Sequence, residues 1–445
     1  MSEGIPALGP VPRLRLGRPL RTELDNQLSL TVVARTAVPR VELHLLVPAG
    51  TVLAPVPASG ELLRRALLTG TAHRDSVTLT GDLHSIGGDL QVAQDEDVLM
   101  IQGSALAEYE AELYELVADV ALHATFPAAE VAAERVRLAE GLRMARSTPH
   151  FPAGETLRAL VYADHPYGWP TPTDGQVRRC GAPIVRELHR RRFRPGAAQL
   201  TVVGAVDPRR SVARVRRAFG DWRGRGGQGR APAVRHRPPG PLTLIDRPGS
   251  VQTVVDLAVS TPPIGHPDHL PLVLATTILG GGMASRLFRN LRERHGYTYG
   301  PRTQGDSHLR DILVVSGAEV RTEVTGAAYA ELLYELGRLA TTDVSAEELE
   351  GAKRYVTGTR LIGVQTQAGL AGSLASLGAH GLDHRYLETF ADRIGRIGAA
   401  DVRAVAARHL APGRAQTVMV GDAKRILDEV RVFGPVTLRR ATRSR

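Results

Sequence analysis

The chain has 445 residues, 43% of them hydrophobic and 23% charged, a composition typical of a globular protein with two or three domains. Its one cysteine, Cys180, excludes an intramolecular disulfide, and the lack of long apolar runs predicts a cytoplasmic protein without signal peptide or membrane span. The formal net charge of +10 favours acidic partners, but the basic residues are not interleaved with stacking aromatics, so we expect no nucleic-acid binding.

Residues 1–222 alternate between strand-like and helix-like patterns, and we expect them to form a first domain. Short apolar runs bounded by turn residues predict strands, and apolar residues at helical spacing predict helices. In chain order these patterns predict strands at 28–33 and 41–47, a helix at 60–69, a hairpin at 88–103, helices at 105–124, 126–144, 154–163 and 183–192, a strand at 199–204 and a helix at 208–222.

Residues 223–241 carry glycine, proline and arginine without periodicity, which predicts a linker. A second domain is expected at 242–445. Its patterns predict a strand at 252–257, a helix at 268–279, a short helix before 294, the start of a strand at 296–300, a strand at 312–320 and a loose basic tail from 435.

The two halves share landmarks at a nearly constant offset. AELYEL at 111–116 returns as ELLYEL at 331–336, and RPGAAQLTVVG at 194–204 returns as APGRAQTVMVG at 411–421. Units this long indicate a duplicated domain, because the repeats of a solenoid are far shorter. The predicted fold class is therefore α+β, with two homologous tandem domains, each a mostly antiparallel or mixed sheet layered with helices.

The stretch LGGGMASRLFRNLRERHGYTYG at 279–300 has three interpretations. Its three glycines lack the Lys-Ser/Thr that follows a phosphate-binding loop, so we set that one aside. Arg286, Arg289 and Arg294 are expected to form a solvated helix face. Arg292 and Tyr299 are candidates for a binding pair, because their donors suit the carbonyls of an extended peptide.

This block, GGDL at 87–90 and the tandem domains resemble the insulinase/pitrilysin-type zinc peptidases with an inverted zinc motif. The resemblance is greatest to the short, two-domain bacterial branch, which is similar to the mitochondrial processing peptidase, and it runs from about residue 25 to 425. It implies two homologous halves facing each other across a chamber, and two such chains that pair like a clamshell.

The family's catalytic motif, H-x-x-E-H on an early helix, binds zinc through two imidazoles and uses the glutamate as general base. In this chain Glu61, Arg64 and Arg65 stand at those positions, and Glu140 stands near the later glutamate ligand. Guanidinium groups do not ligate a cation, and we expect Glu61 to pair with both arginines. We therefore predict no metal site and no cofactor in this chain.

The substrate side of the family's pattern is retained. By resemblance, Arg292 and Tyr299 hold the substrate backbone beside the scissile bond. Gly87, Gly88, Asp89 and Leu90 lead into the edge strand to which substrate adds as a further strand, although an ordinary hairpin bulge is an equally open interpretation of this segment.

These observations predict a non-catalytic, substrate-binding subunit of a heterodimeric zinc endopeptidase, inactive alone. The expected partner is a homologous catalytic subunit that carries H-x-x-E-H and the zinc. The expected substrate is a peptide, and the basic net charge favours an acidic one, such as the leader peptide of a precursor. The alternative is a structural or scaffold homologue with no role in proteolysis.

Overall fold

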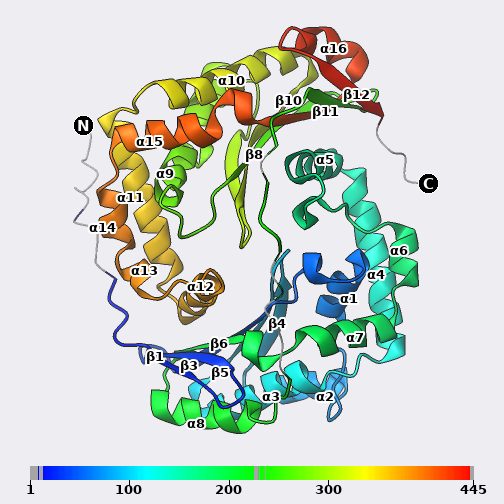
Figure 1. The fold of residues 1–445 in the computed structure, drawn as a ribbon, viewed down its shortest axis with the longest axis vertical. Helices are drawn as coiled ribbons and strands as arrows, with labels where there is room; N and C mark the ends of the chain where they lie inside the picture. Colours follow the sequence, from blue (N-terminus) through cyan, green and yellow to red (C-terminus); the bar gives the residue numbers. More distant parts are fainter. Residues whose placement is uncertain (1–8, 10–13, 225–228, 230, 236, 441–445) are drawn as a thin grey trace, which may run out of the picture.

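The computed structural model describes the chain except for residues 1–8, 10–13, 225–228, 230, 236 and 441–445. Two six-stranded sheets lie at opposite ends of the molecule, each layered with helices (Figure 1). All strands of the first sheet precede residue 222, and all strands of the second follow residue 241. Part of the predicted linker lies outside the described residues.

The first sheet has the order β1-β2-β6-β3-β5-β4. Its strands are β1 (Leu20–Glu23), β2 (Ser29–Ala34), β3 (Arg40–Val47), β4 (Asp89–Gln94), β5 (Leu99–Leu106) and β6 (Gln199–Gly204). The helices of this half are α1 (Pro57–Ala66), α2 (Ser76–Ser85), α3 (Glu110–His123), α4 (Ala128–Ser147), α5 (His150–Tyr162), α6 (Asp174–Arg179), α7 (Ala182–Arg192) and α8 (Pro208–Phe219).

The second sheet has the order β12-β7-β11-β8-β10-β9. Its strands are β7 (Leu242–Asp246), β8 (Gln252–Thr261), β9 (Arg302–Ser307), β10 (Ile312–Arg321), β11 (Gln416–Gly421) and β12 (Val436–Arg440). The helices of this half are α9 (His269–Gly280), the π-helical segment η5 (Phe288–Arg294), α10 (Thr325–Thr341), α11 (Ala346–Gly363), α12 (Gln367–Ala379), α13 (Arg385–Glu388), α14 (Phe390–Gly395), α15 (Ala399–Val405) and α16 (Ala423–Arg431).

The predicted duplication is confirmed by the sheet topology. The order β2-β6-β3-β5-β4 corresponds strand for strand to β7-β11-β8-β10-β9, and β6 and β11 are the repeated QLTVVG and QTVMVG segments. Parallel pairing occurs between β2 and β6 and between β7 and β11, and antiparallel pairing occurs in the three ladders beyond them. The predicted α+β class with mixed sheets is therefore correct.

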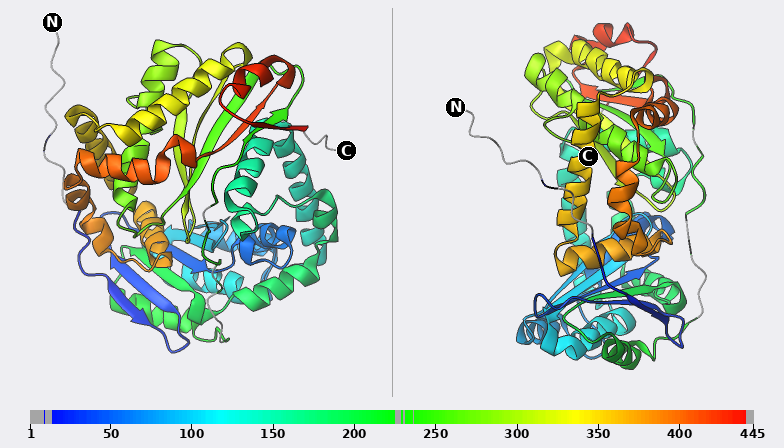
Figure 2. Two further views of the ribbon diagram at one scale, coloured as in Figure 1. Left: turned by 45° about the horizontal axis from the view of Figure 1, so that its top comes forward. Right: turned by 90° about the vertical axis from the view of Figure 1, so that its left-hand side faces the viewer.

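Each domain lends one helix to the sheet of the other, as the views in Figures 1 and 2 show. Helix α5 packs on β8 and β11 of the second sheet, and α12 packs on β3 and β6 of the first. Ala153, Leu157 and Val161 of α5 join an apolar cluster with Val254 and Val418 of the second sheet. This exchange fixes the two domains against each other through buried surface.

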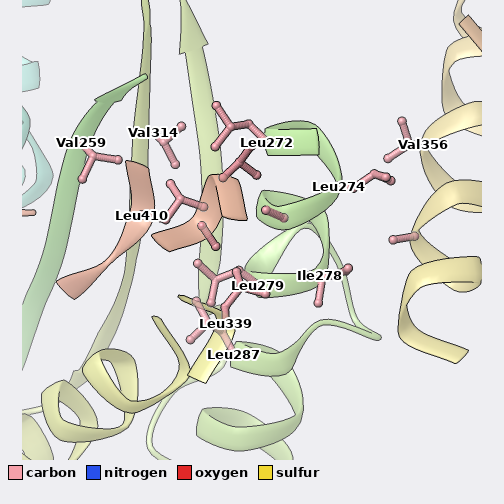
Figure 3. Close-up of a cluster of buried hydrophobic side chains, with 14 of the residues drawn as sticks. Val259, Leu272, Leu274, Ile278, Leu279, Leu287, Val314, Leu339, Val356 and Leu410 are labelled. Atoms are coloured by element: carbon pink, nitrogen blue, oxygen red, sulfur yellow. The ribbon is translucent and has the colours of Figure 1, made fainter. Parts of the chain in front are cut away.

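The core of the second domain forms around α9 (Figure 3). Leu272, Leu274, Ile278 and Leu279 of this helix are buried against side chains of β8, β10, α10 and α11. Burying each such side chain stabilises the fold by about 1.5–3 kcal/mol. The glycines that follow permit close packing, since a Cβ on Gly280 would lie 2.5 Å from the backbone nitrogen of Thr303 on β9.

Three predicted elements need correction. Residues 296–300 form a loop, because Gly296 has φ +63° and Pro301 has no backbone N–H for a sheet, and β9 begins only at Arg302. Residues 105–106 belong to β5, so the following α-helix begins at Glu110. The tail predicted from residue 435 contains β12, which pairs parallel with β7.

No helix among the described residues has both the length and the apolar character that a membrane crossing requires.

Candidate functional site

Helix α1 carries the three positions that replace a zinc motif. Leu62, Leu63 and Ala66 are buried against the domain, which leaves Glu61, Arg64 and Arg65 on the half-buried face, each with 27–29% of its side chain exposed. Arg64 Nη2 donates to Glu61 Oε1 at 2.6 Å, and Arg65 Nε donates to the same oxygen at 3.1 Å. These ion pairs within one helix are the ones predicted from the spacing.

The charges of this triad settle whether a zinc ion fits it. Burial alone would raise the pKa of Glu61, but the hydrogen bonds and positive charges of Arg64 and Arg65 outweigh it, and the net pKa is lowered. The carboxylate is therefore ionised and already neutralised by two guanidiniums. Because these guanidiniums would repel a cation and offer no lone pair, the three residues do not fit zinc.

Glu140, at the predicted position of the later zinc ligand, lies on the exposed side of α4. Val131 and Leu138 mark the buried stripe of that helix, and Glu134 lies along the same stripe with 14% of its side chain exposed. Glu134 pairs with Arg137 one turn later. The helical spacing from Val131 would have indicated Glu134 as the more inward carboxylate.

The GGDL segment leads into a strand at the edge of the first sheet, the position that the resemblance implies. Gly87 has φ +56°, which favours glycine, and Asp89 and Leu90 begin β4 with the first exposed and the second buried. The β4–β5 register is continuous from Asp89 to Gln94, so β4 itself contains no bulge, and Gly87 and Gly88 lie before its first paired residue. Helix α1 contacts β4, which puts the replaced motif beside this edge.

Arg292 and Tyr299 are brought together, as predicted, although Tyr299 lies in a loop and not in a strand. The guanidinium carbon of Arg292 lies 4.2 Å from the centroid of the Tyr299 ring and 4.6 Å from that of Phe288. Its Nη1 donates to the carbonyl oxygen of Tyr299 at 3.2 Å. The Tyr299 side chain is 81% exposed, and its hydroxyl makes no hydrogen bond to the described residues.

The loop of Tyr299 borders a hollow of about 480 Å³. The hollow also reaches the first domain, because His150 at the start of α5 lies 3.4 Å from the Glu319 carboxylate of β10. The remaining side chains of its wall are Gln252, Tyr297, Thr298, Arg302 and Arg321. An extended peptide would meet both charged and aromatic groups here.

The expectation that Arg286 is solvated is wrong. Its side chain is 5% exposed and binds Glu348 of α11 through Nε at 2.7 Å and Nη2 at 3.0 Å. The hydrogen bond from Arg286 lowers the pKa of Glu348 to about 2. Arg289 and Arg294 are exposed, as predicted. The helix-pattern argument missed Arg286 because its partner lies on another element.

Sequence reasoning also missed two groups of side chains whose donor atoms converge. One contains His73, Asp119 and His123, and the other contains Glu96, Asp306 and His308. Asp119 and His123 lie four residues apart on α3, but His73 precedes that helix, and Glu96 lies in the other domain from Asp306 and His308, so neither group forms one continuous sequence motif. The loop before α2, which bridges to the end of α3, brings His73 to the first group, and the domain contact brings Glu96 to the second.

Comparisons with known proteins place the chain among peptidase relatives. One family model, described as insulinase (peptidase family M16), matches residues 31–173, and another, described as the peptidase M16 inactive domain, matches residues 182–356. An uncharacterized zinc protease of Mycobacterium tuberculosis is 27% identical over 380 residues, which cover 83% of this chain and 84% of the relative. The zinc protease YmxG of Bacillus subtilis is 21% identical over 311 residues, 68% of this chain and 74% of the relative.

Two solved structures have the same fold over nearly the whole chain. The peptidase M16 inactive domain from Pseudomonas fluorescens superposes with a TM-score of 0.85 at 21% identity, covering 91% of this chain and 98% of that chain. A protease from Helicobacter pylori superposes with a TM-score of 0.84 at 17% identity, covering 92% of this chain and 100% of that chain.

Proposed function

The chain belongs to the insulinase-type M16 peptidase family, and from that premise we propose that it is the non-catalytic, substrate-binding subunit of a heterodimeric zinc endopeptidase. The observation that carries this proposal is the ionic triad on α1, where Arg64 and Arg65 neutralise Glu61 and leave no room for a metal. A homologous catalytic subunit with H-x-x-E-H would supply the zinc and the general base.

The role of this chain would be to hold the peptide. The Tyr299 hydroxyl and the remaining N–H groups of Arg292 are free to donate to peptide carbonyls. The free edge of β4 offers backbone groups to an added strand. Such contacts accelerate hydrolysis by orienting the scissile bond, and only where metal and water are already positioned.

Charge and composition support a proposal for the substrate and the setting. A net charge of +10 favours an acidic peptide, such as the leader peptide of a precursor. The single cysteine is consistent with a cytoplasmic complex. We propose neither nucleic acid nor membrane as a partner.

The test is to assay peptide hydrolysis by the purified chain, by the homologous H-x-x-E-H chain encoded nearest to it, and by their mixture. We expect hydrolysis that needs both chains and is reduced by Arg292→Ala and by Tyr299→Phe. Arg294→Ala is the matched control, because Arg294 is an exposed arginine of the same π-helical segment.

Two outcomes would contradict the proposal. Hydrolysis by the lone chain, removed by a chelator, would make it a peptidase with other ligands. A mixture that is inert, or active but indifferent to Arg292→Ala, would favour a scaffold homologue. One observation supports that alternative, since Arg292 already donates one hydrogen bond to the carbonyl of Tyr299 within the chain.

A further inference from the structure

The two domains meet where the hairpin turn between β4 and β5 touches the end of β9. Asp97 of the turn accepts a hydrogen bond from the backbone nitrogen of Leu309 at 2.8 Å, across a separation of 212 residues. It also accepts from the hydroxyl of Tyr167 at 2.7 Å. Asp97 is buried, so these contacts fix the turn of the first domain against the strand end of the second.

His308 lies at the centre of this contact with 1% of its side chain exposed. Its ring stacks on Tyr167 with the centroids 4.3 Å apart, and its Nδ1 lies 2.9 Å from Asp311 Oδ1. A carboxylate is an acceptor only, so Nδ1 carries the proton and donates. In the neutral ring the lone pair then lies on Nε2, and this buried atom has no hydrogen-bond partner among the described residues.

Nε2 faces two carboxylates, one from each domain. It lies 3.7 Å from Oε2 of Glu96 in the β4–β5 turn and 3.8 Å from Oδ2 of Asp306 on β9. Within the described part of the chain, neither carboxylate pairs with an arginine or lysine. An imidazole nitrogen and two unpaired carboxylates thus converge, and their ligand atoms all lie within 4.8 Å of one another.

These distances suit a bridging cation better than direct contact. Hydrogen bonds to oxygen have heavy-atom distances of about 2.7–3.2 Å, shorter than either separation. Two ligands of a tetrahedral zinc ion, each about 2.1 Å from the metal, lie about 3.4 Å apart. A small closing movement of the side chains of Glu96 and Asp306, which are 29% and 60% exposed, would reach that spacing.

We propose that Glu96, Asp306 and His308 form a binding site for a divalent transition metal, with zinc as the best match, that joins the two domains. The imidazole favours zinc over calcium or magnesium. Asp311 has the place of the carboxylate that orients a metal-bound histidine through its other nitrogen. The exposed side of Asp306 leaves a path for entry and room for water as a fourth ligand.

This inference is independent of the proposed peptidase role, and it departs from the expectation that this chain holds no metal. The site lies in the domain contact and not on α1. The role that follows is structural, since a metal held by both domains stabilises only the arrangement in which β4 and β9 lie together.

The group of His73, Asp119 and His123 serves as an internal control. Its carboxylate is already engaged, because Asp119 accepts from Thr71 Oγ1 at 2.8 Å, from Arg74 Nη1 at 2.7 Å and from the His73 ring at 2.7 Å. The nearby positive charge of Arg74 opposes a cation. Substitution at His73 therefore tests whether any surface histidine accounts for metal binding.

The test uses the full chain without a histidine tag, stripped of metal by a chelator and titrated with zinc by calorimetry. We expect one zinc ion per chain and a rise in melting temperature on binding. Glu96→Gln and Asp306→Asn should each weaken binding at least tenfold, and Asp311→Asn should weaken it by about 10–100-fold through loss of ring orientation. His73→Gln should bind as the wild-type chain does.

Cobalt(II) gives a second readout. Its visible absorption should gain the intensity of tetrahedral coordination in the wild-type chain and lose it in His308→Gln. Because His308→Gln removes a buried side chain, a failure to fold would also abolish the signal, so Glu96→Gln and Asp306→Asn, at more exposed positions, decide the matter. A wild-type chain that binds no stoichiometric zinc, or Glu96 and Asp306 variants that bind it unchanged, would overturn the proposal.

Discussion

The two halves of the molecule use arginine in opposite ways, on α1 in the first half and beside Tyr299 in the second. On α1 of the first half, Arg64 and Arg65 both bind Glu61 within the helix. In the second half, Arg292 binds no carboxylate among the described residues and rests instead on the rings of Phe288 and Tyr299. Both arginines of α1 are ion-paired with Glu61, whereas Arg292 keeps its charge and most of its N–H donors for a ligand.

This comparison indicates that the partner of an arginine, and not its position on a helix, decides whether it can bind a ligand. A guanidinium paired with a carboxylate has little binding capacity left, whereas one that lies over an aromatic ring keeps most of its N–H groups. On this ground we expect the replaced zinc motif to be inert and the Arg292–Tyr299 pair to bind a ligand.

The largest effect is expected for Arg286, an arginine of the second half that is paired with a carboxylate as Arg64 and Arg65 are in the first half. Arg286→Ala should lower the free energy of unfolding by about 3–5 kcal/mol, because it leaves the Glu348 carboxylate half-buried without its partner. Denaturant unfolding measures this, with the exposed Arg289→Ala as control at about 0.5 kcal/mol or less. A loss no larger than that of the control would show that pairing does not separate these arginines.

The next largest effect concerns ligand binding and not stability. Arg292→Ala should reduce hydrolysis by the two-chain mixture about 100-fold, the usual consequence of a misplaced substrate. Its unfolding free energy should stay close to that of the wild-type chain, since Arg292 has no carboxylate to leave unpaired. A large loss of stability with little loss of rate would instead make Arg292 a structural residue, like Arg286.

Much of this contrast could be predicted from the sequence, and the parts that could not be predicted have physical causes. The Glu61 pairs follow from i, i+3 and i, i+4 spacing on one helix, and the duplicated sheet follows from repeated strands. Arg286 was misjudged because Glu348 lies 62 residues away on α11. The convergence of Glu96 with His308 was invisible because only the packing of the two domains brings them together.

The two helices exchanged between the domains, α5 and α12, also differ in their contacts. The pH dependence of stability tests this difference. Helix α5 meets the second sheet mainly through apolar side chains, with His150 near Glu319 at its start. Helix α12 meets the first sheet beside His44, whose Nδ1 has no partner in the described residues. Burial lowers the pKa of His44 to about 4. The unfolded state takes up its proton first, so this contribution to stability is present above about pH 6.5 and is lost as pH falls towards 4.

The corresponding prediction is a pH-dependent change in unfolding free energy. Between pH 6.5 and 4, His44→Gln should lose about 2 kcal/mol less of its free energy of unfolding than the wild-type chain does. This is somewhat less than the full free energy that corresponds to the shift in the pKa of His44. His189 and His269, whose pKa values burial also lowers to about 4, contribute to the remaining slope. The exposed His84→Gln is the control, and a profile of His44→Gln that parallels this control would refute the argument.

The smallest effect is expected at the replaced motif itself. Arg64→Ala removes one of two ion pairs to Glu61, both on a half-exposed face, so the unfolding free energy should fall by only about 0.3–0.5 kcal/mol. Arg65 still neutralises the carboxylate, and hydrolysis by the two-chain mixture should be unchanged, because α1 here supplies neither metal nor base. A tenfold loss of rate in Arg64→Ala would mean that its guanidinium contacts the substrate. The arginines of α1 would then have the substrate-binding role that we propose for Arg292.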